Sequence, residues 1–250
     1  MEIILLGTAD AISDEKHPNT HLLIKSGERL VLIDCPDNPI PRLIKAGVAY
    51  QDLTDLVLTH FHPDHVGGVP TLLMNLWLLG RQNALNIYGL DYTIDRFVGM
   101  MGLYSWSTWP NFYPVSMHRL SDKGMVEVLA TKDLRIFSSS VCHLIPNLGL
   151  RFEALESGKT AAYSSDTEFC QDTITLAQGV DLLFHEAAGA YPGHSAAFQA
   201  GEVACQAGAR KLCLVHYPAG AFNPRHLLEQ ARQAYDGEVI LGEAGMQFKL

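Results

Sequence analysis

The chain has 250 residues, 48% of them hydrophobic, and a formal net charge of −9. This length and apolar content predict a single globular domain spanning residues 1–250. The acidic balance argues against an extended nucleic-acid surface, which needs clustered Lys and Arg. The sequence contains no run of 18 uncharged apolar residues, so we expect no membrane span.

The start of the chain and its cysteines predict a cytoplasmic protein. The opening stretch "MEIILLGTADAISD" carries an acid where a signal peptide would carry Lys or Arg, so we do not expect export. The five cysteines are odd in number and form no C-x-x-C pair, which is typical of a reduced cytoplasmic protein.

Short β-like runs dominate the first half of the chain, and helical patterns interleave with them in the second half. The predicted strands cover residues 2–7, 21–27, 28–34, 54–60, 86–90, 133–143, 149–155, 160–166, 180–186 and 211–217. The predicted helices cover Pro39–Ala46, Pro70–Gly80, Ser195–Ala207 and Pro224–Tyr235. This order predicts an α/β fold with helices packed outside its sheets.

Five of the apolar runs end on a titratable residue. These residues are His60, His143, Asp166, His185 and His216. In α/β folds the carboxyl ends of the strands and the loops after them form the ligand crevice. We therefore expect one site, assembled along one edge of the sheets.

The stretch "THFHPDHVGG" is the densest cluster of such residues. It contains four potential metal ligands, namely His60, His62, Asp64 and His65. Because His60 and His62 are two residues apart, they project the same way in extended backbone, and Pro63 disfavours helix at His62. We expect Gly67 and Gly68 to let the chain turn sharply into the following helix.

The number of potential ligands indicates two metal ions. A tetrahedral zinc needs three or four ligands. The loop offers four, and His143, Asp166 and His216 arrive from elsewhere in the chain. Seven ligands are too many for one ion, and the absence of cysteine among them is typical of a catalytic rather than a structural site.

The H-x-H-x-D-H loop resembles the metal loop of the metallo-β-lactamase superfamily, and the rest of the chain resembles the ribonuclease Z branch. The motifs that carry this likeness are "LLGTADA", "VLIDC", "HLIPNLGLRF", "YSSDT", "LLFHEAAG", "GHS" and "KLCLVHY". The resemblance implies a four-layer αβ/βα sandwich and a metal-dependent hydrolase.

The resemblance also implies the ligand assignment. One ion would be held by His60, His62 and His143, the other by Asp64, His65 and His216, and Asp166 would bridge the two. Zn²⁺ is the preferred ion, with Mn²⁺ and Fe²⁺ as alternatives. Two such ions would share a bridging hydroxide as the nucleophile, and Asp64 is a candidate catalytic residue that accepts its proton.

Two further residues are candidates for catalysis. Ser195 is expected to be the N-cap of a helix, which places His194 just ahead of a helix N-terminus, where a phosphate is favoured. In the resembled branch the matching histidine is catalytic, and Glu186 is the candidate that orients it. The alternatives are that His194 only caps its helix, and that His185 and Glu186 only support the metal ligands.

The sequence departs from the long tRNA-processing members of the branch. Those members insert a tRNA-gripping arm between the third histidine and the bridging aspartate, but only 22 residues separate His143 from Asp166 here. The motifs "HEAA" and "HSA" also lack two hydroxyls of the branch pattern. The expected substrate is a phosphodiester, either an RNA 3′ end or tRNA precursor or a small cyclic nucleotide. These departures argue against tRNA 3′-end cleavage, and the compact chain is also similar to related branches that lack the arm and hydrolyse small cyclic phosphodiesters.

Other interpretations stay open. A lactone or thioester would suit the same metals, and a redox module is a third reading, although no flavin domain is present. Residues 103–115 hold five aromatic residues and form either a satellite core cluster or an apolar lid. We expect Cys142 in the core. Arg151 is either a solvated charge on a strand or a phosphate contact. The resemblance also allows a homodimer.

Overall fold

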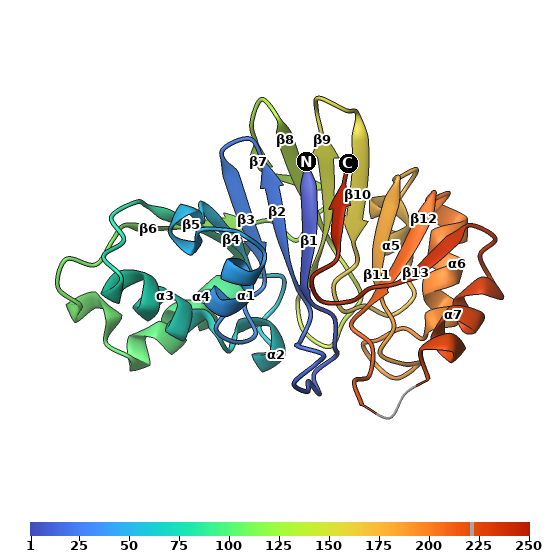
Figure 1. Ribbon diagram of the computed structural model, residues 1–250, viewed down its shortest axis with the longest axis horizontal. Coiled ribbons are helices and arrows are strands. Elements are labelled where there is room, and N and C mark those ends of the chain that lie inside the picture. Colours follow the sequence, from blue (N-terminus) through green and yellow to red (C-terminus); the bar gives the residue numbers. More distant parts are fainter. Residues whose placement is uncertain (221–222) are drawn as a thin grey trace.

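Two sheets lie face to face at the centre of the computed structural model, which describes residues 1–220 and 223–250 (Figure 1). Within these residues each sheet has seven strands. The first has the order β14 (Gln247–Lys249), β1 (Glu2–Gly7), β2 (His21–Ser26), β3 (Arg29–Ile33), β4 (Asp55–Val57), β5 (Leu85–Leu90) and β6 (Val115–Leu120). The second has the order β13 (Glu238–Leu241), β12 (Lys211–Val215), β11 (Leu182–Glu186), β10 (Lys159–Tyr163), β9 (Leu148–Ala154), β8 (Leu134–Ser140) and β7 (Val126–Ala130).

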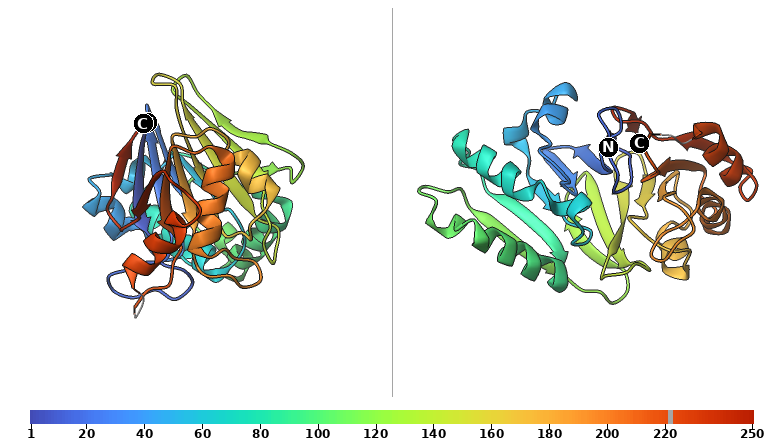
Figure 2. Two further views of the ribbon diagram at one scale, coloured as in Figure 1. Left: turned by 90° about the vertical axis from the view of Figure 1, so that its right-hand side faces the viewer. Right: turned by 90° about the horizontal axis from the view of Figure 1, so that it is seen from below.

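Helices cover the outer face of each sheet (Figures 1 and 2). On the first sheet lie α1 (Ile40–Lys45), α2 (Pro63–Val66), α3 (Val69–Leu78) and α4 (Asp91–Leu103), with short 3₁₀ turns at Tyr50–Asp52 and Trp106–Thr108. On the second sheet lie α5 (Gln171–Leu176), α6 (Ala197–Ala207) and α7 (Pro224–Arg232). The predicted four-layer αβ/βα sandwich is confirmed.

Period-two alternation explains why the strands are apolar on both faces. In β1, Ile3 and Leu5 point into the apolar layer between the two sheets. Ile4 and Leu6 point the opposite way, into the layer beneath the helices of the first sheet. Because successive side chains of a strand lie on opposite faces, a strand covered on both sides reads as a continuous apolar run.

The carboxyl ends of the site-bearing strands meet at one edge of the sandwich, where α2 lies (Figure 1). Strands β10, β11 and β12 are parallel neighbours. Strand β8 runs in the same direction, since β9 is antiparallel to both β8 and β10. This arrangement brings residues that are far apart in the sequence to one place.

Several elements were not predicted from the sequence. Helix α4 buries Ile94, Phe97 and Met101 at helical spacing, but Gly99 and Gly102 lower its helix propensity and it has no side-chain N-cap. Strand β6 is an edge strand whose residues are mostly exposed, so it lacks the apolar alternation that reveals a strand.

The aromatic stretch 103–115 packs as a satellite of the core. Trp109 stacks on Trp77 of α3 at 4.9 Å between ring centroids, and the buried Tyr113 donates a hydrogen bond to the Leu73 carbonyl. Leu103 and Tyr104 stay exposed. Over the described ranges, no helix is long and apolar enough to cross a bilayer.

Candidate metal centre

The loop after β4 is shaped by its proline and by close backbone contacts. His62 is the N-cap of α2 in an extended conformation, and Pro63 occupies the first helical position. A Cβ on Gly68 would lie 2.0 Å from the Asp37 carbonyl oxygen, and one on Gly67 would lie 2.6 Å from that of Pro63. Both glycines have negative φ, −59° and −85°. The chain turns at this glycine pair from α2 into α3, and the pair is needed because the backbone approaches closely there.

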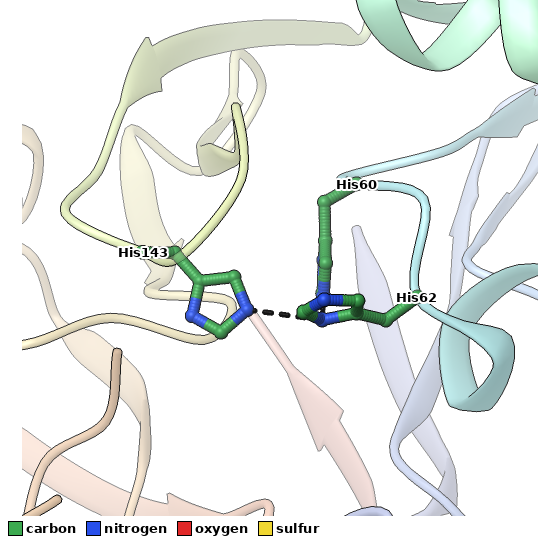
Figure 3. Close-up of side chains that lie close together, drawn as sticks. All are labelled: His60, His62 and His143. Atoms are coloured by element: carbon green, nitrogen blue, oxygen red, sulfur yellow. Dashed lines mark hydrogen bonds between the residues drawn. The ribbon is translucent and has the colours of Figure 1, made fainter. Parts of the chain in front are cut away.

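Three imidazoles from two loops converge on one point (Figure 3). Nδ1 of His62 lies 3.1 Å from Nε2 of His60 and 3.1 Å from Nε2 of His143. Nitrogens about 2.0–2.1 Å from a tetrahedral zinc are roughly 3.3 Å apart. The spacing of the three rings therefore fits one divalent ion.

Groups behind the rings fix which nitrogen faces the centre. Nδ1 of His143 donates to the Gly193 carbonyl at 2.7 Å. Nδ1 of His60 lies 3.1 Å from Thr59 Oγ1, which itself donates to Asp34 at 2.8 Å. These contacts leave Nε2 of both rings as a lone-pair donor, the arrangement in which histidine binds a metal.

A second cluster lies beside the first. Nε2 of His216 is 3.5 Å from Asp64 Oδ2 and 3.3 Å from Asp166 Oδ1. Nε2 of His65 is 3.5 Å from Asp64 Oδ2 and 3.4 Å from Asp166 Oδ2. Asp166 Oδ2 also lies 3.7 Å from Nε2 of His60. The Asp166 carboxylate thus stands between the two clusters.

Four buried atoms of the second cluster have no hydrogen-bond partner among the described residues. They are Nε2 of His65, Oδ1 of Asp166 and both ring nitrogens of His216. Buried polar atoms are nearly always paired, so a group of unpaired ones requires an explanation. Both Nε2 atoms lie within 3.4 Å of the Asp166 carboxylate, and a divalent cation between these groups would satisfy three of the four atoms.

Two groups at the centre, Asp166 and His60, are in the protonation states that suit cation binding. Burial raises the pKa of the Asp166 carboxyl, but His216 and His65 outweigh it and hold that pKa well below its usual value. Burial lowers the pKa of His60 well below its usual value. Asp166 is therefore anionic and His60 neutral, the forms that bind metal ions.

Asp34 is a supporting residue that the sequence analysis missed. Its carboxylate accepts hydrogen bonds from the Thr59 amide, the Thr59 hydroxyl and Nδ1 of His65, each at 2.8 Å. The sequence pattern could have identified it, because Asp34, like the proposed ligands, ends an apolar run.

A titratable residue at the end of an apolar run does not always reach the site. His185 ends such a run on β11, but it belongs to neither cluster, and its Nδ1 pairs with the Glu186 carbonyl.

The partly exposed His194 and the buried Glu186 form a pair next to the clusters. Nδ1 of His194 lies 3.0 Å from Glu186 Oε1. The fully buried Glu186 carboxylate also accepts hydrogen bonds from the amides of Thr167 and Ala188. A nitrogen of His194 lies within 4.8 Å of a nitrogen of His143 and an oxygen of Asp166. The side chain of His194 is thus directed at the centre.

The predicted helix cap was wrong. Ser195 donates its hydroxyl to the Thr167 carbonyl at 2.6 Å, and α6 is capped instead by Ala196, whose amide donates to the Gln199 side chain. His194 pairs with Glu186, so the alternative that it only caps the helix is wrong as well.

Glu168 connects the loops that carry His143 and His194. Its carboxylate accepts the Gly193 amide at 2.8 Å, and the Gly193 carbonyl accepts Nδ1 of His143. A groove beside His194 is lined by Glu168 and by the rings of Phe169 and Tyr191. Sequence analysis did not single out these residues because they follow no apolar run.

Two further predictions are corrected by the structure. Strand β8 ends at Ser140, so Cys142 lies in a loop and is exposed, whereas we expected it in the core. Arg151 is half-buried and donates to Glu153 and to two backbone carbonyls, which makes it a structural link rather than a free phosphate contact.

Comparisons with known proteins give matches over nearly the whole chain. The family described as "Anti-Pycsar protein Apyc1" matches residues 1–231. The ribonuclease Z of Methanothermobacter thermautotrophicus is 25% identical over 291 aligned positions, covering 94% of this chain and 92% of that protein.

Solved structures show the same fold. The metallo-β-lactamase fold protein YhfI from Bacillus subtilis superposes with a TM-score of 0.83 at 22% identity, covering 99% of this chain and 98% of that one. The short form of human tRNase Z superposes with a TM-score of 0.78 at 22% identity, covering 100% of this chain and 99% of that one.

Proposed function

Because the chain belongs to the family of the anti-Pycsar protein Apyc1, within the ribonuclease Z-like branch of the metallo-β-lactamase fold, we propose that this metal-dependent hydrolase cleaves a small phosphodiester at a dinuclear centre. The predicted membership of that branch is confirmed. The observation that carries the proposal is the position of His194, beside Asp166 and paired with the buried Glu186, at the edge of two ligand clusters.

The two clusters would hold two divalent ions. His60, His62 and His143 would bind one, Asp64, His65 and His216 the other, and Asp166 would bridge them. We prefer Zn²⁺, with Mn²⁺ and Fe²⁺ as alternatives, because the donors are imidazoles and carboxylates. When bound, such ions supply positive charge to the phosphoryl oxygens and lower the pKa of water.

The chain itself supplies proton transfer and orientation. Asp64 is placed at the second cluster to accept a proton from the attacking water. Burial lowers the pKa of His194, but its hydrogen bond to Glu186 outweighs this and raises the pKa above its usual value. His194 is therefore suited to donate a proton to the leaving oxygen, and Glu186 orients it.

Three observations favour a small substrate over tRNA. Strands β9 and β10 occupy the 22 residues where an arm would be inserted. The net charge of −9 leaves little attraction for a long phosphate backbone. The groove beside His194 presents the exposed rings of Phe169 and Tyr191, which suit the base of a nucleotide. We therefore favour a small nucleoside phosphodiester, such as a cyclic nucleotide, over an RNA end.

The proposal is tested by hydrolysis of bis-p-nitrophenyl phosphate with Zn²⁺ or Mn²⁺ added. We expect turnover by the wild type, and its loss in Asp64→Asn, which keeps the shape of the side chain. Asp95→Asn is the matched control, because Asp95 is an exposed carboxylate that pairs with Arg119. Circular dichroism checks that each variant is folded.

Two outcomes would contradict the proposal. One is turnover no higher than that of Asp64→Asn under every metal condition. The other is rapid hydrolysis of lactones or thioesters by the same preparation with no phosphodiester cleavage, which would indicate a carbonyl hydrolase of the same superfamily.

A further inference from the structure

Two cysteines lie close together, one of them directly before His143. Sγ of Cys142, Sγ of Cys170 and a carboxylate oxygen of Asp172 all lie within 4.8 Å of one another. Cys142 is exposed in the loop after β8, and Cys170 is half-buried directly before α5. Neither cysteine belongs to the two metal clusters described above, so the pair has no role in the proposed hydrolysis.

The surroundings of Cys170 favour a reactive thiolate. Its Sγ lies 3.2 Å from Thr173 Oγ1 and 3.7 Å from Thr167 Oγ1. Burial raises the pKa of the Cys170 thiol, but its hydrogen bonds with Thr173 and Cys142 outweigh burial and hold that pKa below its usual value. A thiolate stabilised next to an exposed thiol is the arrangement in which disulfide exchange occurs.

The backbone of Cys142 is part of the support of the metal centre. Its amide donates to Thr167 Oγ1 at 3.1 Å, and its carbonyl accepts the Glu168 amide at 2.7 Å. These bonds tie the His143 loop to the segment that follows Asp166. Because His143 is the next residue, any displacement of Cys142 moves the imidazole that stands 3.1 Å from His62.

We propose that Cys142 and Cys170 are a site of reversible oxidation, and that the disulfide between them weakens metal binding by displacing His143. The two sulfurs must close to about 2.05 Å to form the bond. Cys170 is held by α5, whose Ile174 and Leu176 are buried, whereas Cys142 lies in an exposed loop. Most of the movement therefore falls on Cys142 and its neighbour.

A small-molecule disulfide such as oxidised glutathione completes the chemistry. The Cys170 thiolate attacks one glutathione sulfur, which breaks the glutathione S–S bond and expels a glutathione thiolate. The Cys142 sulfur then attacks the Cys170 sulfur and expels the second glutathione thiolate, which takes up the proton of the Cys142 thiol. Two electrons thus pass from the protein thiols to the two glutathione sulfurs. An excess of a dithiol reduces the new Cys142–Cys170 bond, which makes the oxidation reversible.

The test treats zinc-loaded protein with oxidised glutathione and measures two quantities that need no turnover. Peptide mass spectrometry without reduction detects the Cys142–Cys170 link, and a chromophoric chelator measures released zinc. We expect the link to form and zinc affinity to fall about 10–100-fold, as when a residue supporting a metal ligand is altered. Dithiothreitol should reverse both changes. Phosphodiester cleavage, which rests on the proposed function, is followed in parallel.

Matched cysteine variants make the test specific. Cys170→Ser and Cys142→Ser should retain zinc in oxidised glutathione, whereas Cys205→Ser should respond like the wild type, because Cys205 is exposed on α6, apart from the pair.

Four results would overturn the proposal. Three concern the disulfide, namely absence of the linked peptide, a linked peptide with unchanged zinc affinity, and equal zinc loss from Cys170→Ser. A bound zinc present in the reduced wild type and missing from both variants would also overturn it, since the thiols and Asp172 would then be a metal site. Zinc loss on oxidation without any phosphodiester cleavage would support the disulfide and contradict only the proposed hydrolysis.

Discussion

Oε1 of Glu186 lies 3.0 Å from Nδ1 of His194, and the same oxygen accepts the amide hydrogen of Thr167, the residue after Asp166. One buried carboxylate thus fixes both the imidazole at the mouth of the centre and the backbone next to the carboxylate between the clusters. Because Nδ1 of His194 pairs with Glu186, Nε2 is the ring nitrogen that can donate a proton to a leaving oxygen.

Replacing Glu186 with Gln should shift the pH dependence of kcat. The pKa of His194 is raised by its hydrogen bond to Glu186, despite burial. A proton donor must be protonated, so activity is lost as pH rises through the pKa of His194. Glu186→Gln removes the negative charge, and we expect the alkaline limb to move to lower pH by about one unit. The pH profile of kcat measures this shift, with the surface variant Glu127→Gln as control. An alkaline limb at the same pH in the wild type and in Glu186→Gln would contradict the prediction.

The loss of activity caused by His194→Ala should depend on the leaving group of the substrate. An alcohol leaving oxygen needs a proton, whereas p-nitrophenolate departs without one. General acid catalysis contributes about 10²–10⁴-fold, so we expect a loss of that order for a nucleoside phosphodiester and a much smaller loss for bis-p-nitrophenyl phosphate. Steady-state kinetics on both substrates decide this, and equal losses would show that His194 acts in binding only.

The sequence indicated the proposed ligands better than their supports, for a physical reason. The H-x-H-x-D-H loop is local in sequence, and His143, Asp166 and His216 each end an apolar run. His185 also ends such a run, so the family resemblance was needed to select the three. Asp34 ends such a run too, but only the fold shows its carboxylate behind His65. The exposure of Cys142 depends on where β8 ends, and strand ends are the least regular part of a sequence pattern.

Replacing Asp34 with Asn should weaken metal binding without removing a ligand. Asp34 accepts Nδ1 of His65 at 2.8 Å and so directs Nε2 of that ring to the centre. Loss of such an outer carboxylate costs about 10–100-fold in metal affinity. Competition with a chelator of known affinity measures this, and Asp91→Asn, at an exposed carboxylate, serves as control. Unchanged affinity would mean that the imidazole is held by packing alone.

Removing the metal should make stability depend on pH. Burial lowers the pKa of His216, but Asp166 and Asp64 outweigh it, so in the metal-free protein that pKa is raised above the usual 6.5. The protonated ring then stabilises the fold at low pH, and this stability is lost as pH rises above about 6.5 through the raised pKa. Zinc replaces the proton and adds about 2.7 kcal/mol at a hundred times its Kd.

Thermal unfolding between pH 6 and 9 tests this expectation. The Tm of chelator-treated protein should fall across that range, whereas the Tm of zinc-loaded protein should change little. If Tm varied with pH in the same way for the chelator-treated and the zinc-loaded protein, the prediction that a proton replaces the metal ion would be contradicted.

Replacing each of two helix glycines with Ala should change the free energy of unfolding in opposite directions. A Cβ on Gly201 of α6 would lie 2.4 Å from the Ala231 carbonyl oxygen of α7, whereas a Cβ on Gly99 of α4 would meet nothing within 4 Å. Gly201→Ala should lower the free energy of unfolding by about 1–3 kcal/mol, because the two helices must separate. Gly99→Ala should raise it by about 0.5–1 kcal/mol through helix propensity. Urea unfolding measures both, and equal effects would show that α6 and α7 can move apart freely.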